Sequence, residues 1–174
     1  MLRAPTAADR DTVRAWRNQA INREVSVTDH MISEAEHRRW WDAVAEDPSR
    51  RMLVFVHDDL PCGAVNFFDI DLDARTGSWG FFLDNETLSA EGTLLSAWMA
   101  IMRQATDYAF DTLGLDRLHG EVLEDNAPVR QMNRRFGLVE RTDDVREIDG
   151  RRFVPITLTR EERGRRTRRR KKDA

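Results

Sequence analysis

Apolar and polar positions along the chain change their period several times, and each change marks a predicted element. Residues 51–57, 62–72 and 77–83 are short, mainly apolar runs, and turn-forming residues separate them. Such runs predict three strands joined as an antiparallel meander. Between positions 94 and 110 apolar residues recur at helical spacing, which predicts one long helix that ends near Gly114.

The N-terminal part predicts a short strand and two helices. Residues 1–18 read as a short strand followed by an amphipathic helix. Ser33 and Glu36 have the spacing of a capping box, so a second helix is expected from about Glu34. The polar stretch 83–92 lies between the third strand of the meander and the long helix, and it is expected to be a loop.

The C-terminal part predicts three more strands and one more helix. A strand over 115–124 is followed by a helix over about 127–136. The segments 138–148 and 151–159 are separated by Asp149–Gly150, which favours a hairpin. The expected order is β-α-α-β-β-β-α-β-α-β-β. It describes a mixed α/β (α+β) fold with a mostly antiparallel, seven-stranded sheet and about four helices.

Length and charge divide the chain into a body and a tail. One domain is expected over residues 1–159. Residues 160–174 hold nine Lys or Arg against three Asp or Glu, so the tail carries +6 and the body −9. Such a tail is expected to be disordered. It is the part of the chain through which nucleic acid or a ribosome would be contacted, whereas an acidic body argues against nucleic acid as the main substrate.

The remaining composition excludes several classes of protein. Cys62 is the single cysteine, so no intrachain disulfide can form, and a reducing compartment is the simpler assumption. No apolar run approaches the ~20 residues of a membrane span, and no signal-peptide pattern is present. The chain is therefore expected to be cytoplasmic, without membrane partners. No metal-ligand spacing, P-loop or serine hydrolase motif occurs, and no metal is expected.

The order of elements favours a ligand site at the mouth of the sheet. The N-terminus of the long helix follows a segment of small residues that includes Ser89, Ala90 and Gly92, and a helix N-terminus attracts phosphate. The strand that ends near Asn126 would lie parallel to residues 77–83. If these two strands splay apart, their free edges can bind an extended amide. Coenzyme A combines a diphosphate with such an amide arm.

The segment 126–137, NAPVRQMNRRFG, resembles a motif of the GNAT superfamily of acyl-CoA-dependent N-acetyltransferases. Asn126, Met132, Arg135 and Gly137 match its pattern, and Leu138 stands where Phe is usual. The resemblance covers about residues 2–159. It implies splayed central parallel strands and acetyl-CoA as co-substrate. The expected cofactor-binding residues are Phe81, Phe82, Leu83, Ser89, Ala90, Glu91, Gly92, Thr93, Leu94, Asn126, Arg130 and Asn133.

Several short segments are similar to sugar-nucleotide N-acetyltransferases of the pseudaminic acid pathway. They are residues 16–18 (WRN), 30–33 (HMIS), 36–40 (EHRRW), 77–82 (GSWGFF) and 121–126 (EVLEDN). The resemblance implies acetyl transfer to a primary amine, with an amino-sugar nucleotide as the best candidate acceptor. The residues expected to bind it are Arg17, Asn18, His30, Met31, His37, Trp40 and Trp79.

The chain departs from the GNAT pattern at three positions. The phosphate-binding segment 87–92 keeps only its last glycine, and Glu91 lies beside it. The position at which many members have a Tyr acid is Asn133, and the sole tyrosine, Tyr108, falls in the long helix. Ser78 stands where many members have a catalytic Glu. The usual phenol is therefore excluded as the acid.

Catalysis then depends on positioning, carbonyl polarisation and a base. A backbone N–H near Phe81 or Phe82 can act as an oxyanion-hole donor, and the Phe82 N–H is expected to be this donor. Candidate bases are Glu121 and His37, and Asp69 and Asp71 remain alternatives. Each would act directly or through water.

Three functional hypotheses remain open. The first is transfer of an acetyl group to a small amine. The second is acetylation of protein N-termini, as in related ribosomal-protein acetyltransferases, which the basic tail would favour. The third is a non-catalytic, CoA-binding GNAT module, which the missing Tyr, Glu and loop glycine would favour. A homodimer is also left open.

Overall fold

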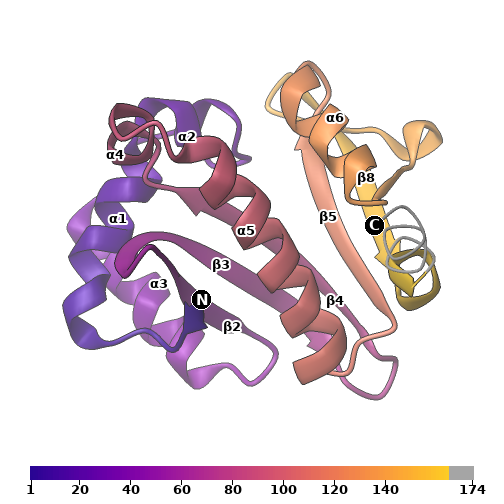
Figure 1. Ribbon diagram of the computed structural model, residues 1–174, viewed down its shortest axis with the longest axis horizontal. Coiled ribbons are helices and arrows are strands. Elements are labelled where there is room, and N and C mark those ends of the chain that lie inside the picture. Colours follow the sequence, from indigo (N-terminus) through magenta and orange to yellow (C-terminus); the bar gives the residue numbers. More distant parts are fainter. Residues whose placement is uncertain (165–174) are drawn as a thin grey trace.

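The computed structural model describes residues 1–164, which form one twisted sheet with helices on both faces (Figure 1). The strand order is β1-β2-β3-β4-β5-β8-β6, and β7 pairs with β8. The strands are β1 (Leu2–Arg3), β2 (Arg51–His57), β3 (Leu60–Asp71), β4 (Thr76–Leu83), β5 (Arg117–Leu123), β6 (Val139–Glu140), β7 (Arg146–Ile148) and β8 (Arg151–Thr159). Within the described residues the sheet thus has eight strands, one more than expected.

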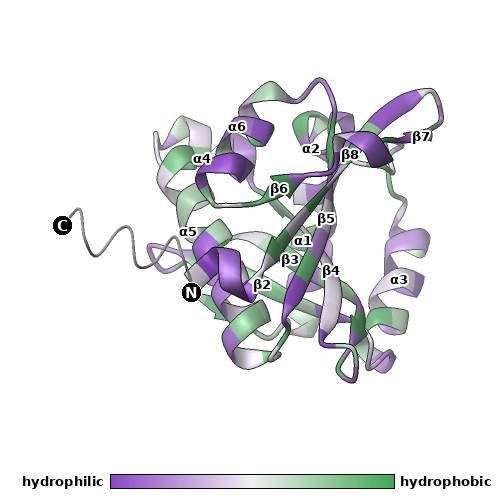
Figure 2. Cartoon of the chain, turned by 90° about the vertical axis from the view of Figure 1, so that its right-hand side faces the viewer, coloured by the Kyte–Doolittle hydropathy of each residue, from purple (hydrophilic) through white to green (hydrophobic). Residues whose placement is uncertain are grey.

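The helices lie in two layers. Figures 1 and 2 show α5 and α6 over one face of the sheet and α1 and α3 over the other. The α-helices are α1 (Arg10–Asn18), α2 (Ala20–Glu24), α3 (Glu34–Glu46), α4 (Asn85–Ala90), α5 (Leu94–Asp107) and α6 (Ala127–Arg135). Short 3₁₀ turns are η1 (Ala7–Asp9) and η3 (Thr142–Asp144), and η2 (Tyr108–Thr112) is π-helical.

The splayed pair of parallel strands is confirmed. Strand β4 pairs with β5 in parallel only at Thr76–Arg117, Gly77–Leu118 and Ser78–His119. Every other neighbouring pair in the sheet is antiparallel. Residues 79–83 of β4 and 120–123 of β5 therefore diverge, and the edges that face each other have no strand partner.

Side-chain alternation along β4 assigns each residue to a layer. Trp79 and Leu83 belong to the main core beneath α5, and Phe81 packs against it. Phe82 contacts the smaller core under α1 and α3, which contains Val13 and Trp16. The sheet is thus covered on both sides at this strand, which fixes the position of its backbone.

Within the stretch 83–92, Asn85–Ala90 forms helix α4, so the expectation of a loop is wrong. The Asp84 side chain accepts a hydrogen bond from the Thr87 N–H, which caps α4. Leu88 is 3% exposed and anchors the helix in the main core. Gly92, with φ of +69°, ends the turn. A short capped helix carries too few apolar positions to show a helical period in the sequence.

The segment 138–148 is broken into β6, η3 and β7 rather than forming one strand. Asp143 and Asp144 occupy the intervening turn, where acidic turn formers interrupt the pairing. The expected hairpin turn at Asp149–Gly150 is present, and both residues have positive φ.

The first residues of the expected tail belong to the folded body. Residues 160–164 are helical, and Arg160 and Arg163 pair with Asp116 and with Asp111. Arg160 and Arg163 also lie over the Phe110 ring. These contacts explain why the boundary does not fall at residue 159. The rest of the tail, residues 165–174, lies outside the described residues.

Candidate active site

A cleft of about 590 Å³ opens where β4 and β5 diverge. Its sides come from these two strands, from α2 with the segment after it, and from the starts of α5 and α6. Gly120 lies at its base, where a Cβ would come within 3.3 Å of the Trp79 Nε1 atom. The glycine therefore lets the Trp79 indole lie against β5.

The backbone of β4 offers hydrogen-bonding groups to this cleft. The Asp84 N–H donates to the Cys62 carbonyl across the β3–β4 ladder at 2.8 Å. Because backbone groups alternate along a strand, those of Phe82 point towards β3, and those of Trp79 and Phe81 point towards β5. The expectation that Phe82 supplies a free N–H is therefore corrected in favour of Phe81.

Helix α6 closes the far side of the cleft. The Asn126 side chain accepts from the Val129 N–H at 3.3 Å, so it is the helix N-cap, and Asn126 also borders the cleft. Asn133 is 4% exposed and lines the same wall. Arg130 is not a cleft residue, because its guanidinium is bound to the Glu140 carboxylate and the Glu124 carbonyl.

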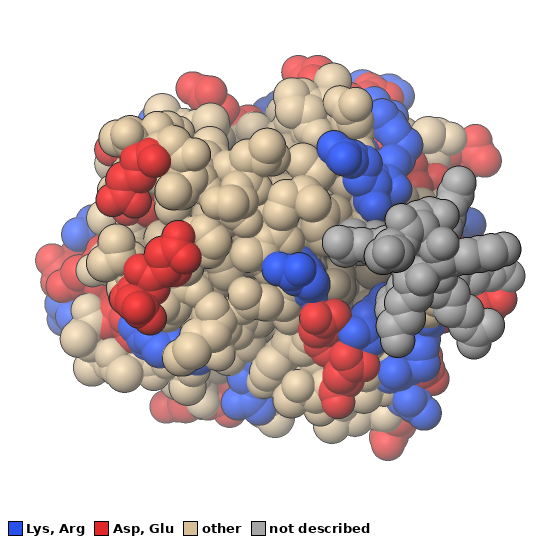
Figure 3. Space-filling view, viewed as in Figure 1, with Lys and Arg blue, Asp and Glu red and all other residues tan. Residues whose placement is uncertain are grey.

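The expected diphosphate seat at 89–93 is already occupied by backbone hydrogen bonds. The N–H groups of Glu91, Gly92 and Thr93 donate to carbonyls of α4. Of the predicted residues in this region, only Leu94 lines the cleft. The first-turn N–H groups of α5, residues 94–96, are the donors that the helix itself does not use. The face in Figure 3 carries acidic side chains near α4 and basic ones over α6.

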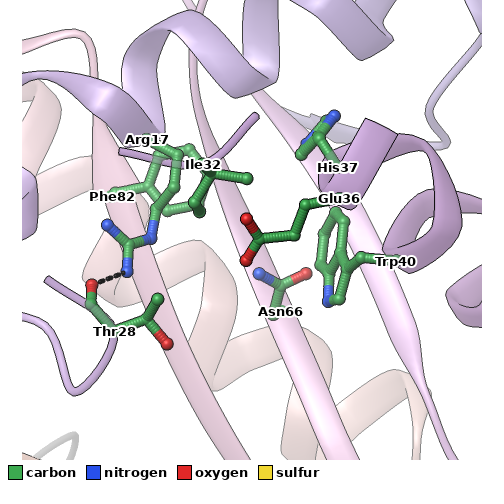
Figure 4. Close-up of a pocket in the computed structure, with 8 residues that line it drawn as sticks. All are labelled: Arg17, Thr28, Ile32, Glu36, His37, Trp40, Asn66 and Phe82. Carbon is green, nitrogen blue, oxygen red and sulfur yellow. Dashed lines mark hydrogen bonds between the residues drawn. The ribbon is translucent and has the colours of Figure 1, made fainter. Parts of the chain in front are cut away.

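A smaller pocket of about 200 Å³ lies on the opposite face, under α1 and α3, and shares Phe82 with the cleft (Figure 4). Asn66 faces into it from β3, and Trp40 borders it from α3. Arg17 and His37 line it as predicted, and the other lining residues are Thr28, Ile32 and Glu36.

Glu36 places a carboxylate in the middle of this pocket, above Asn66 (Figure 4). His30 Nε2 lies 2.9 Å from Glu36 Oε1, and this hydrogen bond lowers the pKa of Glu36. His30 therefore acts on the pocket through Glu36. The capping-box signal identified Glu36 as a structural residue, and its second role was missed.

Arg17 lies across the pocket from Glu36 (Figure 4). Its Nη2 donates to the Thr28 carbonyl at 2.7 Å, and Nη1 is buried without a hydrogen-bond partner. Burial, reinforced by the nearby Arg23 charge, lowers the pKa of Arg17. A half-buried guanidinium with one protein partner is available to a ligand.

His37 is 4% exposed, and its ring centroid lies 5.3 Å from that of Trp40 and 5.8 Å from that of Trp41. Its Nδ1 has no hydrogen-bond partner. Burial, together with the Arg14 charge, lowers the pKa of His37, so its neutral form is favoured. His37 shapes the pocket wall.

Four predicted acceptor residues do not line the small pocket, and His30, which contacts Glu36, is one of them. Asn18 exchanges two hydrogen bonds with the Ile32 backbone, so it positions the segment before α3. Met31 is 61% exposed. Trp79 lines the larger cleft. The segment 25–33 thus separates the two cavities.

Glu121 is the predicted base that lies in the cleft. Leu118 and Val122 point into the main core, so Glu121 projects towards the face that carries the small pocket. Arg146 of β7 pairs with its carboxylate. Asp71 accepts from the Ala74 N–H in the β3–β4 turn, at the other end of these strands.

Asn66 and Gly120 are among the lining residues that the sequence did not predict. Asn66 sits in an apolar strand, and its alternation with buried neighbours is the signal that could have drawn attention to it. Gly120 interrupts a strand, which often marks a close approach to a ligand or to another chain segment.

Sequence comparison identifies the family. A family model described as an acetyltransferase (GNAT) domain matches residues 1–139. The chain belongs to the GNAT acetyltransferase family. It is thus an acyl-CoA-dependent N-acetyltransferase with acetyl-CoA as co-substrate. No curated protein sequence matches the chain significantly.

Solved structures share this GNAT fold. The spermidine N-acetyltransferase from Vibrio cholerae in complex with CoA and spermine has a TM-score of 0.74 at 20% identity, over 94% of this chain and 96% of that one. The spermidine/spermine N-acetyltransferase SpeG from Vibrio cholerae in complex with manganese ions has a TM-score of 0.74 at 17% identity, over 96% of each chain. At these identities the likeness establishes the fold.

The cleft agrees with the GNAT resemblance in its diverging strands and departs from it in having no tyrosine. The diverging strands and the unpaired edge at Trp79 and Phe81 suit an extended amide arm. No tyrosine lines the cleft, because Tyr108 stacks on Phe67 at 5.5 Å between ring centroids. Within residues 1–164 no cluster of three His, Cys, Asp or Glu could hold a metal, and none of the helices could span a membrane.

Proposed function

We propose that this protein transfers the acetyl group of acetyl-CoA to the primary amine of a small molecule bound in the pocket between Arg17 and Glu36. The observation that carries the proposal is that this pocket and the cleft meet at Phe82 from opposite faces of the sheet. An amine in the pocket can then meet a thioester in the cleft beside Phe82.

The backbone of β4 supplies carbonyl polarisation. Acetyl-CoA brings an electrophilic thioester carbonyl and a thiolate leaving group. The Phe81 N–H points to the diverging edge and is the donor placed to hydrogen-bond the carbonyl oxygen. Because the donor belongs to a strand held by β3 on its other edge, it needs no reorganisation during the reaction.

Glu121 is the base that receives the amine proton. It lies in the cleft and projects towards the acceptor face. Arg146 pairs with the carboxylate and fixes its position, so it is a positioning residue. The bound ammonium first loses one proton to solvent, which leaves the neutral amine that attacks the thioester. As the C–N bond forms and the C–S bond breaks, a second proton passes from nitrogen to the Glu121 carboxylate, directly or through water.

The leaving group departs as a thiolate. A free thiol has a pKa near ~8.5, so its anion is an adequate leaving group without a phenol. This agrees with the position of Tyr108 in the core, outside the cleft. Positioning of both substrates supplies much of the rate in such a reaction.

The acceptor class is narrowed by two lines of support. The solved relatives named above acetylate polyamines. Segments such as 36–40 are similar to those of enzymes that acetylate amino-sugar nucleotides. The Glu36 carboxylate suits the ammonium that both classes carry. An amine-bearing small molecule is therefore favoured over a protein N-terminus, whose case rests on residues 165–174, outside the described part of the chain.

The test is turnover of acetyl-CoA with a panel of amines, followed by release of the CoA thiol. The panel contains spermidine, an amino-sugar nucleotide, simple alkylamines and an N-terminal peptide. Turnover with a small amine supports the proposal. Acetyl-CoA binding by calorimetry without turnover on any amine would instead support the non-catalytic CoA-binding hypothesis.

A further inference from the structure

The small pocket holds two opposite charges, and within residues 1–164 only one of them has a titratable side chain as a direct partner. Glu36 has His30 as a partner at 2.9 Å. Arg17 makes no ion pair within residues 1–164 and donates one hydrogen bond, to the Thr28 carbonyl. The charge of Arg23, which lowers the pKa of Arg17, is of the same sign.

An uncompensated guanidinium at a pocket wall is costly. Partial burial removes water from the charge, and a buried donor without an acceptor loses the free energy of a hydrogen bond. Arg130 avoids this cost by pairing with Glu140 at 2.7 Å. Arg17 therefore lacks the kind of partner that a bound anion would supply.

We infer that the acceptor is an amine that also carries an anionic group, a carboxylate or a phosphate. The ammonium lies at Glu36, and the anionic group lies at Arg17 on the other side of the pocket (Figure 4). This inference rests on the proposed function and specifies its substrate class. Arg17 is accordingly a specificity-determining residue.

The size of the pocket limits what it can enclose. About 200 Å³ accommodates the amine-bearing head of a ligand, and a larger remainder would extend past the segment 25–33. A polyamine supplies no anion for Arg17 and adds positive charge next to it. Amines with an anionic group are therefore expected to be preferred to spermidine.

Matched pairs of acceptors test the inference. Ethanolamine is compared with phosphoethanolamine, propylamine with β-alanine, and spermidine is the polyamine reference. Steady-state release of CoA thiol is expected to give a kcat/KM at least about tenfold higher for the anionic member of a pair. The two pairs separate phosphate from carboxylate as the preferred anion.

Variants at position 17 assign the preference to its side chain. In Arg17→Met the preference is expected to disappear, because kcat/KM for the anionic amine falls to the level of the matched amine that lacks the anionic group, while KM for acetyl-CoA changes little. Arg17→Lys keeps the charge and is expected to retain part of the preference. Arg38→Met is the matched control, because Arg38 pairs with the neighbouring Glu34 at the exposed surface of α3.

The outcomes separate this inference from the proposed function. Equal kcat/KM within both pairs, or a preference that Arg17→Met leaves intact, overturns the inference while acetyl transfer stands. If no amine is acetylated, the proposed function fails. Calorimetry with β-alanine and phosphoethanolamine then decides: binding that Arg17→Met abolishes supports the anion site, and absence of binding overturns it.

Discussion

Arg151 of β8 donates its Nη1 to the Ser26 carbonyl at 2.8 Å, across 125 positions of sequence. It also donates to the Glu24 carbonyl. Ser26 and Val27 line the cleft from the α2 side, and Phe153 lines it from β8. One arginine therefore joins the two sides of the cleft and holds the segment that separates the cofactor cleft from the small pocket.

Removal of this link should loosen substrate binding. In Arg151→Met the KM values for acetyl-CoA and for the amine are expected to rise about tenfold, since two charge-assisted hydrogen bonds are worth roughly 1.5–3 kcal/mol each and part of this is recovered from water. Steady-state kinetics measures the change. Arg152→Met is the control, because Arg152 pairs with Glu124 at the surface. Equal KM values in the two variants would exclude a role for the link.

Loss of the carboxylate at Glu121 should slow the chemical step. Glu121→Gln keeps the shape of the side chain and cannot accept the amine proton. We expect kcat to fall by about 10²–10⁴-fold with KM for acetyl-CoA nearly constant. Glu147→Gln, on the exposed β7 strand, is the matched control. A kcat within a factor of three of wild type would remove Glu121 from the mechanism.

Two glycines separate blocking of the site from loss of stability. A Cβ at Gly80 meets no atom within 4 Å, so Gly80→Leu should fold normally and fill the junction of cleft and pocket. We expect kcat/KM to fall by at least about 100-fold at an unchanged Tm. Full activity of Gly80→Leu would show that the reaction does not take place beside β4.

Gly92→Ala should show the opposite pattern. Its φ of +69° disfavours a side chain, so the variant should lose about 1 kcal/mol of stability, or about 2–4 °C in Tm. Because the N–H groups at 91–93 are used by α4, KM for acetyl-CoA should not change. A raised KM for acetyl-CoA would indicate instead that the turn at 89–93 binds the diphosphate.

The sequence predicted the elements whose periodicity is long. The meander, α5 and α6 follow from local patterns, and they were placed correctly. Helix α4 was missed because six residues carry too little periodic signal. The parallel pairing of β4 with β5 follows from chain order, whereas its end at Ser78–His119 depends on side chains packed between distant elements.

The site was predicted less well than the fold, and contacts between distant residues explain why. The motif 126–137 suggested that Arg130 binds the cofactor, but its guanidinium is held by the carboxylate of Glu140, ten residues later. Whether Phe82 or Phe81 supplies the free backbone N–H depends on which of the two hydrogen-bonds to β3. That assignment requires the register of the β3–β4 pair. Glu36 had a complete local explanation as a capping residue, so nothing in the sequence pointed to a second role.

Cys62 should be unreactive in the folded protein. Burial raises the pKa of its thiol to about 11, and its side chain is 3% exposed. Since the thiolate is the reactive form, a disulfide reagent at pH 8 should label it only after unfolding. Labelling followed by mass spectrometry with and without denaturant measures this. Rapid labelling of the native protein would contradict the burial of Cys62. Slow labelling means that Cys62 adds no background signal to the assay of released CoA thiol.

His37 should make the protein less stable as the pH falls. Burial lowers the pKa of His37 in the folded chain, whereas the unfolded chain has the ordinary value near ~6.5. Below that pH the unfolded state binds the extra proton, so the free energy of unfolding decreases as the pH falls towards the folded pKa, and the penalty is absent well above pH 6.5. Urea unfolding between pH 5 and 8 should show this slope, and His37→Phe should reduce it. His119→Phe is the comparison, since His119 also has a lowered pKa. A slope that His37→Phe leaves unchanged would place the pH-sensitive group elsewhere.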